Sequence, residues 1–323
     1  MKMGLGTWRF FLAFLVAISH LWSGMIHGPA AYSVWGFFVL SGYLMTYVLC
    51  NKYGFSLTGL LAYARNRFLR IYPAYYFLCF LGALTLLVLP KHGVIPSTLN
   101  PQFHGPKSWA DYWFNVTLIP LWGGGDLWVP VSNALAVEVG VYILVPFMAV
   151  SRSAAWLGFI LSFLINAYFG LSTGFSLRYS HFLSSFIAFG VGSLTCHYRH
   201  VLRAIALSRI SVLVWCIHGV VWLWYDAWPW TYGLYVSVLL SAWVVVSLAE
   251  EDVGALDKWL GDLSYPLYLV HTTAAAWVLL FYGAGRSDFF FFIISFAITL
   301  LLSWFIIVVI DRPLGRLKYR PRV

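Results

Sequence analysis

The chain has 323 residues, of which 61% are hydrophobic, 20% aromatic and only 10% charged. Soluble domains carry roughly 25% charged residues, so this composition excludes a water-soluble globular protein and predicts an integral membrane protein. The net charge of +9 is compatible with a nucleic-acid partner, but the placement of the charges along the chain explains it as membrane topology. No nucleic-acid partner is expected.

The apolar segments predict an all-α integral membrane protein. They are ~17 to 23 residues long, which suits helices that cross a ~30 Å hydrocarbon core and does not suit barrel strands of about ten residues. We expect about ten transmembrane helices in one membrane-embedded domain, residues 1–323, with no appended soluble domain. The expected spans are 8–26, 32–50, 72–90, 131–150, 154–172, 181–198, 210–227, 231–249, 260–282 and 288–310.

The first apolar segment contains two ionisable residues, Arg9 and His20. Eleven helical residues make about three turns and rise ~16 Å, so the two residues share nearly one face at two depths. Ionisable groups at membrane depth are costly and by default line a protein interior or a wet cavity. The alternative is structural: an arginine that snorkels from a helix end and a histidine bonded to a neighbouring helix.

The second and third segments combine small residues with a basic stretch. Gly36, Ser41 and Gly42 permit close approach of another helix, which alone indicates packing. The stretch 65–73 carries three arginines, Arg65, Arg67 and Arg70, and then Pro73, which we expect in the first turn of the next helix. Arginines at this place serve topology or lipid contact, or they bind a phosphate-rich cytosolic ligand through bidentate hydrogen bonds.

The distribution of basic residues predicts the orientation. With the N-terminus inside, fifteen lysines and arginines fall on the cytoplasmic side: Lys2, Lys52, Arg65, Arg67, Arg70, Arg152, Arg199, Arg203, Arg209, Lys258, Arg312, Arg316, Lys318, Arg320 and Arg322. The outside receives Lys91, Lys107, Arg178 and Arg286. This asymmetry predicts that both termini are cytoplasmic, and the basic tail is expected to contact anionic lipid headgroups.

The longest outer loop, 91–130, is rich in proline and aromatic residues. Its aromatic residues are Phe103, Trp109, Tyr112, Trp113, Phe114, Trp122 and Trp128. A loop of this length is usually functional or disordered, and so many aromatic residues argue against disorder. It either caps a cavity or lies in the headgroup zone as an aromatic belt.

Two later segments carry further polar side chains at helical spacing. Glu138 and Tyr142 share a helix face at i and i+4, and Tyr268 and His271 share one at i and i+3, with Ser264 one turn below. For all five residues the alternative to a functional role is a structural one, as paired groups or in interhelical hydrogen bonds. There is no HExxH and no Cys/His cluster, so no metal site is predicted.

Taken in order, these motifs resemble the acyltransferase-3 family of membrane-bound O-acyltransferases that modify bacterial surface polysaccharides. The resemblance rests on five stretches: Arg9-Phe10 followed by His20; 37–44, FFVLSGYL; 67–73, from Arg67 to Pro73; 137–146, VEVGVYILVP, which fits V-E-x-x-x-Y-x-L-x-P; and 264–271, SYPLYLVH, which fits S-Y-x-x-Y-L-x-H. It covers nearly the whole chain. Two departures are Asn66-Arg67, where many members have paired arginines, and Glu138-Val139-Gly140-Val141-Tyr142, where E-E-Q-F-Y is usual.

The resemblance implies ten helices in a bacterial inner membrane, an acyl-CoA donor from the cytoplasm, taken as acetyl-CoA, and an acceptor sugar hydroxyl at the outer side. The acceptor is expected to be an envelope glycan such as lipopolysaccharide, or its lipid-linked precursor. The resemblance marks Arg9 and His20 as the hallmark pair and assigns Arg65, Arg67 and Arg70 to the donor.

The residues suit this chemistry. Transfer from a thioester to an alcohol needs a base, and His20 fits because the pKa of histidine lies near working pH; a covalent acyl-histidine is the alternative. Arg9 is expected to bind donor phosphates or a developing oxyanion. Glu138 is expected to orient His20 or bind the sugar, and five side chains are expected to line the cavity: Ser41, Tyr142, Ser264, Tyr268 and His271.

Three functions compete at this point. The first is direct O-acyl transfer, and the second is a transmembrane conduit that hands the acyl group to a separate extracytoplasmic transferase. The third is a transporter, which the lack of a recognisable internal repeat disfavours. The sequence leaves open the sugar, the acyl chain length and the oligomeric state, a homodimer included.

Overall fold

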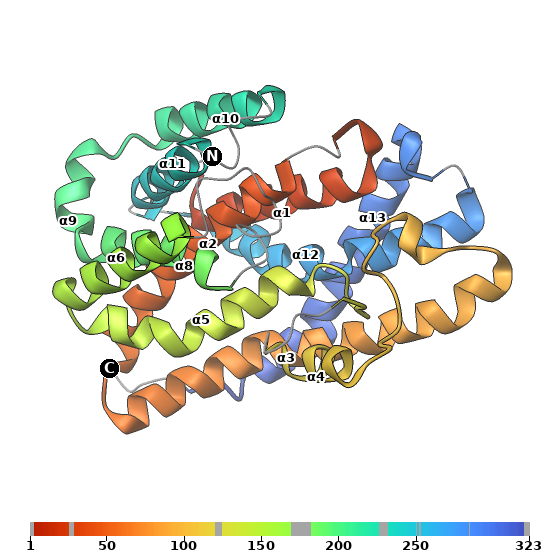
Figure 1. Ribbon diagram of the computed structural model, residues 1–323, viewed down its shortest axis with the longest axis horizontal. Coiled ribbons are helices and arrows are strands. Elements are labelled where there is room, and N and C mark those ends of the chain that lie inside the picture. The colour runs from red at the N-terminus through yellow and green to blue at the C-terminus, as the bar shows by residue number, and fades with distance from the viewer. Residues whose placement is uncertain are drawn as a thin grey trace.

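A computed structural model describes residues 3–25, 29–119, 125–168, 182–225, 232–249, 251, 253–283 and 285–319. Within these residues every regular element is a helix (Figure 1). The α-helices are α1 (Leu5–Leu21), α2 (Pro29–Val48), α3 (Leu57–Val88), α4 (Trp109–Thr117), α5 (Ser132–Val150), α6 (Arg152–Tyr168), α8 (Phe182–His197), α9 (Arg199–Leu202), α10 (Ser208–Trp224), α11 (Tyr232–Ala249), α12 (Ala255–Tyr282), α13 (Phe289–Ile306) and α14 (Arg312–Gly315).

Short helical turns join these elements. The 3₁₀ turns are η1 (Ser23–Met25), η3 (Leu89–His92), η4 (Pro96–Thr98), η5 (Arg203–Ile205) and η6 (Gly285–Ser287). Two π-helical turns, η2 (Leu49–Tyr53) and η7 (Ile307–Asp311), end α2 and α13. Such turns are rare and occur often at functional sites.

The helix lengths confirm a multi-pass membrane protein. In the described part of the chain, six helical stretches are long and apolar enough to cross a membrane, and a seventh is added if the pair α9–η5 and α10, bent by 83°, forms one span. Each of the ten expected ranges overlaps a helix, but α1, α6 and α8, of 16 or 17 residues, are shorter than a full span. The number of crossings and the orientation stay predictions; Lys2, Arg178, Arg320 and Arg322, used for that orientation, lie outside the described residues.

Helices α1 and α12 lie side by side and run in the same direction. At their beginnings the Asp257 carboxylate accepts hydrogen bonds from the backbone N–H groups of Gly4, Gly6 and Thr7 at 2.8–3.0 Å, and from the Thr7 hydroxyl at 2.6 Å. The first N–H groups of a helix have no partner within the helix, so Asp257 supplies it from α12. This contact fixes the register of the two helices along their length.

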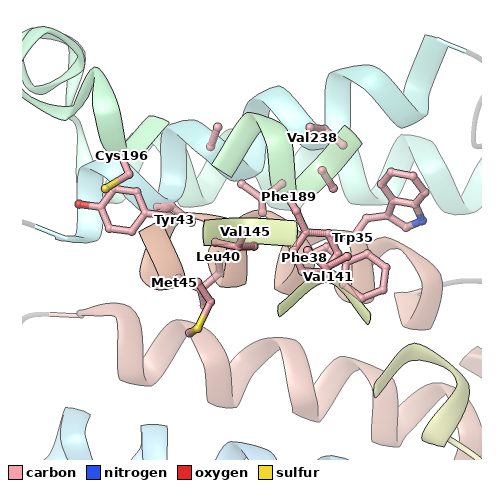
Figure 2. Packing of buried hydrophobic residues seen from close by; sticks show 14 of the residues in the cluster. Trp35, Phe38, Leu40, Tyr43, Met45, Val141, Val145, Phe189, Cys196 and Val238 are labelled. Atoms are coloured by element: carbon pink, nitrogen blue, oxygen red, sulfur yellow. The ribbon is translucent and has the colours of Figure 1, made fainter. Parts of the chain in front are cut away.

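Helices α2 and α8 approach each other closely through glycines. A Cβ atom at Gly42 would clash with the backbone oxygen of Phe189, and one at Gly192 would clash with that of Val39. Phe38 stacks on Phe189 with ring centroids 4.8 Å apart, beside Trp35 in the same buried cluster (Figure 2). The packing role expected for Gly42 is thus confirmed, as small residues let membrane helices meet.

Helix α3 begins much earlier than expected. Ser56 caps it by accepting a hydrogen bond from the Gly59 N–H at 3.2 Å, and the helix continues through Pro73 to Val88. Our placement of Pro73 in the first turn was wrong, because membrane helices tolerate an internal proline at the cost of one backbone hydrogen bond. Helix α3 has 32 residues and is about 48 Å long, whereas the hydrocarbon core of a membrane is ~30 Å thick. The part of α3 that carries the arginines therefore continues the same helix beyond the part that can span the membrane.

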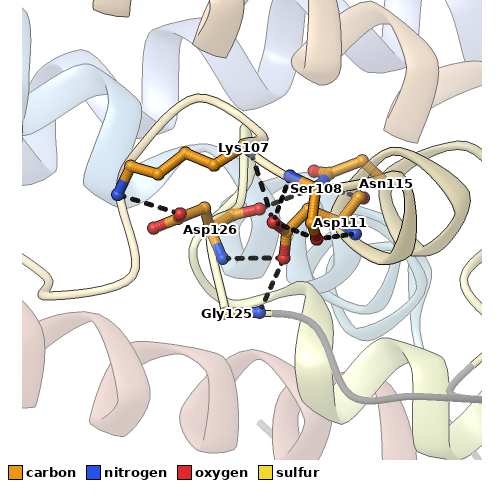
Figure 3. Close-up of polar contacts among 6 residues, drawn as sticks. All are labelled: Lys107, Ser108, Asp111, Asn115, Gly125 and Asp126. Atoms are coloured by element: carbon orange, nitrogen blue, oxygen red, sulfur yellow. Dashed lines mark hydrogen bonds and ion pairs between the residues drawn. The ribbon is translucent and has the colours of Figure 1, made fainter.

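The described residues of the segment 91–130 are organised around Asp111 (Figure 3). The Asp111 carboxylate accepts hydrogen bonds from the N–H and hydroxyl of Ser108 and from the N–H of Gly125 at 2.7–3.2 Å. Partial burial raises the pKa of Asp111, but these hydrogen bonds outweigh it and lower the pKa to about 2. Lys107 forms an ion pair with Asp126 at 3.0 Å, so the stretches before and after α4 are joined.

The aromatic residues of this segment divide between two environments. Phe103 and Phe114 are buried in the protein core, whereas Trp109 is 89% exposed. Trp122 lies outside the described residues. The described residues of this segment therefore pack partly into the core and partly present rings outward. None of them lines the cavity described below, and the roles of cavity cap and aromatic belt stay predictions.

Candidate active site

A cavity of about 450 Å³ opens between α1, α2, α3, α5, α12 and the segment that follows α14. It brings together most of the residues singled out in the sequence, from five separate helices. Those that line it are Arg9, Ser41, Arg67, Arg70, Glu138, Tyr142, Ser264 and Tyr268. Volumes of this size are typical of small-molecule sites.

The charge of the cavity wall is strongly unbalanced. Among the described residues that line it, the cations are Arg9, Lys52, Arg67, Arg70 and Lys318, and the carboxylate is Glu138. The Nε atom of Arg67 is buried and has no hydrogen-bond partner. Like charges gathered away from water repel one another, and a buried donor without an acceptor is costly. The cavity is therefore suited to a ligand that carries several anionic oxygens.

Glu138 joins two helices at the middle of the cavity. Its Oε1 atom accepts hydrogen bonds from the Ser41 hydroxyl at 2.5 Å and from the Tyr142 hydroxyl at 2.6 Å. Tyr142 was expected near it, because it is one turn along α5, whereas Ser41 was expected only as a cavity residue. Arg9 lies within electrostatic range of Glu138, so the carboxylate offsets part of the positive charge around it.

The basic end of the cavity is formed by α3, the π-turn η2 and the segment after α14. The Arg67 guanidinium lies 5.8 Å from the Tyr63 ring, and Arg70 lies 3.9 Å from the Asp262 carboxylate. Arg65 does not line the cavity: it is exposed and donates a hydrogen bond to the Leu317 carbonyl at 3.0 Å. The three arginines therefore have different surroundings, although they follow one another in sequence.

His20 pairs with His271 across the interface of α1 and α12. Nδ1 of His20 lies 2.9 Å from Nε2 of His271, and the rings stack with centroids 5.1 Å apart. Nδ1 of His271 lies 3.3 Å from the Leu267 carbonyl oxygen. That oxygen can only accept, so in the neutral pair Nδ1 of His271 donates to it, and Nε2 of His271 accepts from Nδ1 of His20. Nε2 of His20 then carries a free lone pair, which is what a base requires.

Aromatic rings lie next to both the cavity and the histidine pair. Among the described residues, neither His20 nor His271 lines the cavity, although His271 was expected there. Tyr268 does line it, and its ring centroid lies 6.4 Å from that of His271 and 6.2 Å from that of Phe37. The Tyr268 hydroxyl donates to the Val131 carbonyl at 2.9 Å. Tyr268 thus reaches from the cavity wall to His271, and Phe37 packs beside it; these two rings are here called the partition.

The C-terminal end of α1 is held by a cation. Arg286, on η6, donates hydrogen bonds to the carbonyl oxygens of Ser19 and Leu99, each at 3.2 Å. It therefore ties the segment 91–119, through Leu99, to the helix turn that carries His20. Asp257 at one end and Arg286 at the other fix the position of α1.

A comparison with models of protein families shows to which family the chain belongs. A family model described as an acyltransferase domain, that of the acyltransferase-3 family, matches residues 4–308. The chain belongs to this family. A search among curated proteins and another among solved structures each found no match. The family membership confirms the resemblance drawn from the motifs and identifies a membrane acyltransferase.

Sequence reasoning missed three residues of the acyltransferase's cavity. Lys52 and Lys318 were counted only as topology charges, and Asn66 was noted only as a departure from paired arginines; all three line the cavity. A tyrosine directly follows each lysine, Tyr53 and Tyr319, and both tyrosines also line it. These two Lys-Tyr pairs at helix ends were the available signal.

Proposed function

We propose that this acyltransferase moves an acyl group, in the first instance acetyl, from acyl-CoA to a sugar hydroxyl of an envelope polysaccharide or its lipid-linked precursor. The proposal places it in a bacterial inner membrane, with ten crossings and both termini in the cytoplasm. The observation that carries it is the cavity wall, which has five cations and one carboxylate among its described residues. Coenzyme A is an anionic ligand of the kind that such a wall attracts.

The donor suits the cavity from end to end. The phosphates of coenzyme A match Arg67 and Arg70 at the basic end, because guanidinium groups form paired hydrogen bonds with phosphate. The pantetheine arm is largely uncharged, and the α2 side of the cavity offers apolar side chains such as Leu40 and Leu44. The arm would thus carry the thioester from the arginines toward Tyr268.

In the proposed reaction His20 acts as the general base. Its Nε2 takes the proton of the sugar hydroxyl as the oxygen attacks the thioester carbonyl carbon. The new C–O bond forms, the C–S bond breaks, and the coenzyme A thiolate leaves and takes the proton from the imidazolium. Arg9 lines the cavity and binds the donor. It stabilises the negative charge that develops on the thioester carbonyl oxygen, or it binds the phosphates of coenzyme A. The partition of Phe37 and Tyr268 must open for the thioester to meet His20.

A second function, the acyl conduit, is favoured by one observation. The cavity reaches Tyr268 but is not lined by His20, so the acyl group has to be passed on beyond the donor site in any case. In a conduit it would leave the protein for a separate transferase instead of meeting an acceptor hydroxyl here.

One experiment tests both functions. The purified protein in lipid nanodiscs is given acetyl-CoA and envelope polysaccharide. The polysaccharide comes from the source strain after deletion of the gene for this protein, so that it has not been modified by it. Free coenzyme A and acetylated polysaccharide are measured, the latter by mass spectrometry. Acetylated polysaccharide supports direct transfer, and release of coenzyme A without it supports the conduit. Failure to bind acetyl-CoA or to release coenzyme A would overturn both.

A further inference from the structure

The segment after α14 folds back onto the beginning of α3. Asn66 forms a reciprocal pair of hydrogen bonds with Tyr319: its Nδ2 donates to the Tyr319 carbonyl at 3.0 Å, and the Tyr319 N–H donates to its Oδ1 at 2.8 Å. Two residues earlier, the Leu317 carbonyl accepts from Arg65. The backbone on both sides of Lys318 is therefore fixed to one helix.

The Asn66 side chain is fully engaged in this contact. It is 4% exposed, and Nδ2 also donates to the Tyr53 hydroxyl at 2.7 Å. An amide both donates and accepts, whereas an arginine can only donate. An asparagine can therefore hold a backbone N–H and a backbone carbonyl of the same residue, and an arginine cannot.

The paired hydrogen bonds between Asn66 and Tyr319, here called the clamp, place Lys318 in the wall of the cavity, together with its neighbour Tyr319. The charged groups in electrostatic range of Lys318 are Arg70, Arg67, Asp311 and Asp262. Burial, and then the charge of Arg70, lower the pKa of Lys318 below its usual value. Lys318 adds a third cation to Arg67 and Arg70, and Asp311 and Asp262 offset only part of this charge, so the group attracts a further anion.

We propose that Lys318 binds a phosphate of the acyl-CoA donor, and that Asn66 is the positioning residue that holds Lys318 in place. This inference rests on the proposed function. It assigns part of the donor site to a segment more than 240 residues from the arginines in sequence. The donor's nucleotide end would then lie between α3 and the segment 315–319, with Lys318 opposite Arg67 and Arg70.

The test measures binding by isothermal titration calorimetry in nanodiscs, with coenzyme A and with pantetheine, which lacks all phosphates. Lys318→Gln should weaken coenzyme A binding more than about tenfold, the worth of a hydrogen bond to a charged group, and leave pantetheine binding unchanged. Arg316→Gln is the matched control: it removes an exposed cation of the same segment that does not line the cavity, and should change neither affinity more than about twofold.

A double-variant cycle tests the role of Asn66. Asn66→Ala should weaken coenzyme A binding but not pantetheine binding, and adding Lys318→Gln to it should cause little further loss, because the two act as one unit. Equal loss for both ligands would show a merely structural role and overturn the positioning claim. If Asn66→Ala gives no folded protein, Lys318→Gln alone decides.

The outcomes separate this inference from the proposed function. If the wild-type protein binds coenzyme A and Lys318→Gln binds it equally well, the inference is overturned and the proposed donor stands. If the wild-type protein does not bind coenzyme A, the proposed donor fails and the inference fails with it.

Discussion

The rings of His20 and His271 are nearly parallel, with an angle of 12° between their planes, and Nδ1 of His20 lies 2.9 Å from Nε2 of His271. The pair depends on the register of α1 and α12, which Asp257 sets at the opposite ends of the two helices. One histidine therefore orients the other, much as a base is oriented by a partner in other acyl-transfer enzymes.

This pairing gives the first prediction. His271→Ala removes the acceptor for Nδ1–H of His20, so the ring loses its fixed tautomer and orientation. We expect kcat to fall about tenfold to hundredfold while KM for acetyl-CoA stays within about twofold, since His271 does not line the donor cavity. Steady-state release of coenzyme A measures both constants.

The matched control is His218→Ala. His218 is another buried histidine, hydrogen-bonded to Tyr32 on α2 and not part of the cavity wall. The folded fraction of the His218→Ala protein should have a nearly unchanged kcat. A fall in kcat as large as that of His271→Ala would show that any buried histidine is equally important, and would refute the orienting role.

Much of the cavity could be predicted from the sequence. Arg9, Glu138 and Tyr142 stood out because polar groups in apolar segments are costly and therefore have partners, and helical spacing placed Tyr142 beside Glu138. Tyr268 was noted for its helical spacing with His271 and Ser41 as a small packing residue, and the family pattern added their place in the cavity. All five line the cavity.

Other features could not be predicted from the sequence. The pairing of His20 with His271 and the clamp between Asn66 and Tyr319 join residues about 250 positions apart, and no local pattern specifies such contacts. Pro73 was placed in a first turn because a proline in a soluble helix usually marks its start; α3 shows that this rule is weak in a membrane span.

The second prediction concerns the partition. Phe37→Trp enlarges one of the two rings of the partition, so the thioester should no longer reach His20. We expect at least a tenfold loss of acetyl transfer, with coenzyme A affinity unchanged because the phosphate end is remote. Transfer assays and calorimetry on the same preparation separate the two effects.

Phe37→Leu serves as the counterpart, because a smaller side chain leaves the path open and should retain transfer. The partition has no role if Phe37→Trp transfers acetyl groups as fast as the wild-type protein.

The third prediction concerns stability. Gly42→Ala places a methyl group against the Phe189 backbone, which cannot give way as a side chain can. We expect a loss of about 1–3 kcal/mol, the usual cost of overpacking, seen as a lower unfolding temperature in detergent. Gly36→Ala is the comparison: its new methyl group would meet only side-chain atoms, Leu12 and Ser241, at 3.3–3.6 Å. An equal effect of the two substitutions would show that backbone contact is not what Gly42 provides.

The fourth prediction concerns pH and the segment around Asp111. The pKa of Asp111 is lowered from 3.8 to about 2 in the folded protein, so its carboxylate stabilises the segment at all pH values above about 4. That stabilisation is lost progressively as the pH falls from about 4 through 2. Asp111→Asn should show the same loosening at pH 7, as faster hydrogen exchange at the amides of Ser108 and Gly125.

Asp126→Asn is the control for this effect, since its carboxylate pairs with the exposed Lys107 and such surface pairs contribute little. Unchanged exchange in Asp111→Asn would mean that the carboxylate does not hold the segment together.

The most direct test of the central claim is acetyl transfer by His20→Ala. The variant protein in nanodiscs is given acetyl-CoA and envelope polysaccharide, and acetylated product is counted by mass spectrometry alongside calorimetric binding of coenzyme A. We expect no product above background together with unchanged coenzyme A affinity, because the donor cavity does not include His20. Product formation at the wild-type rate would contradict the account.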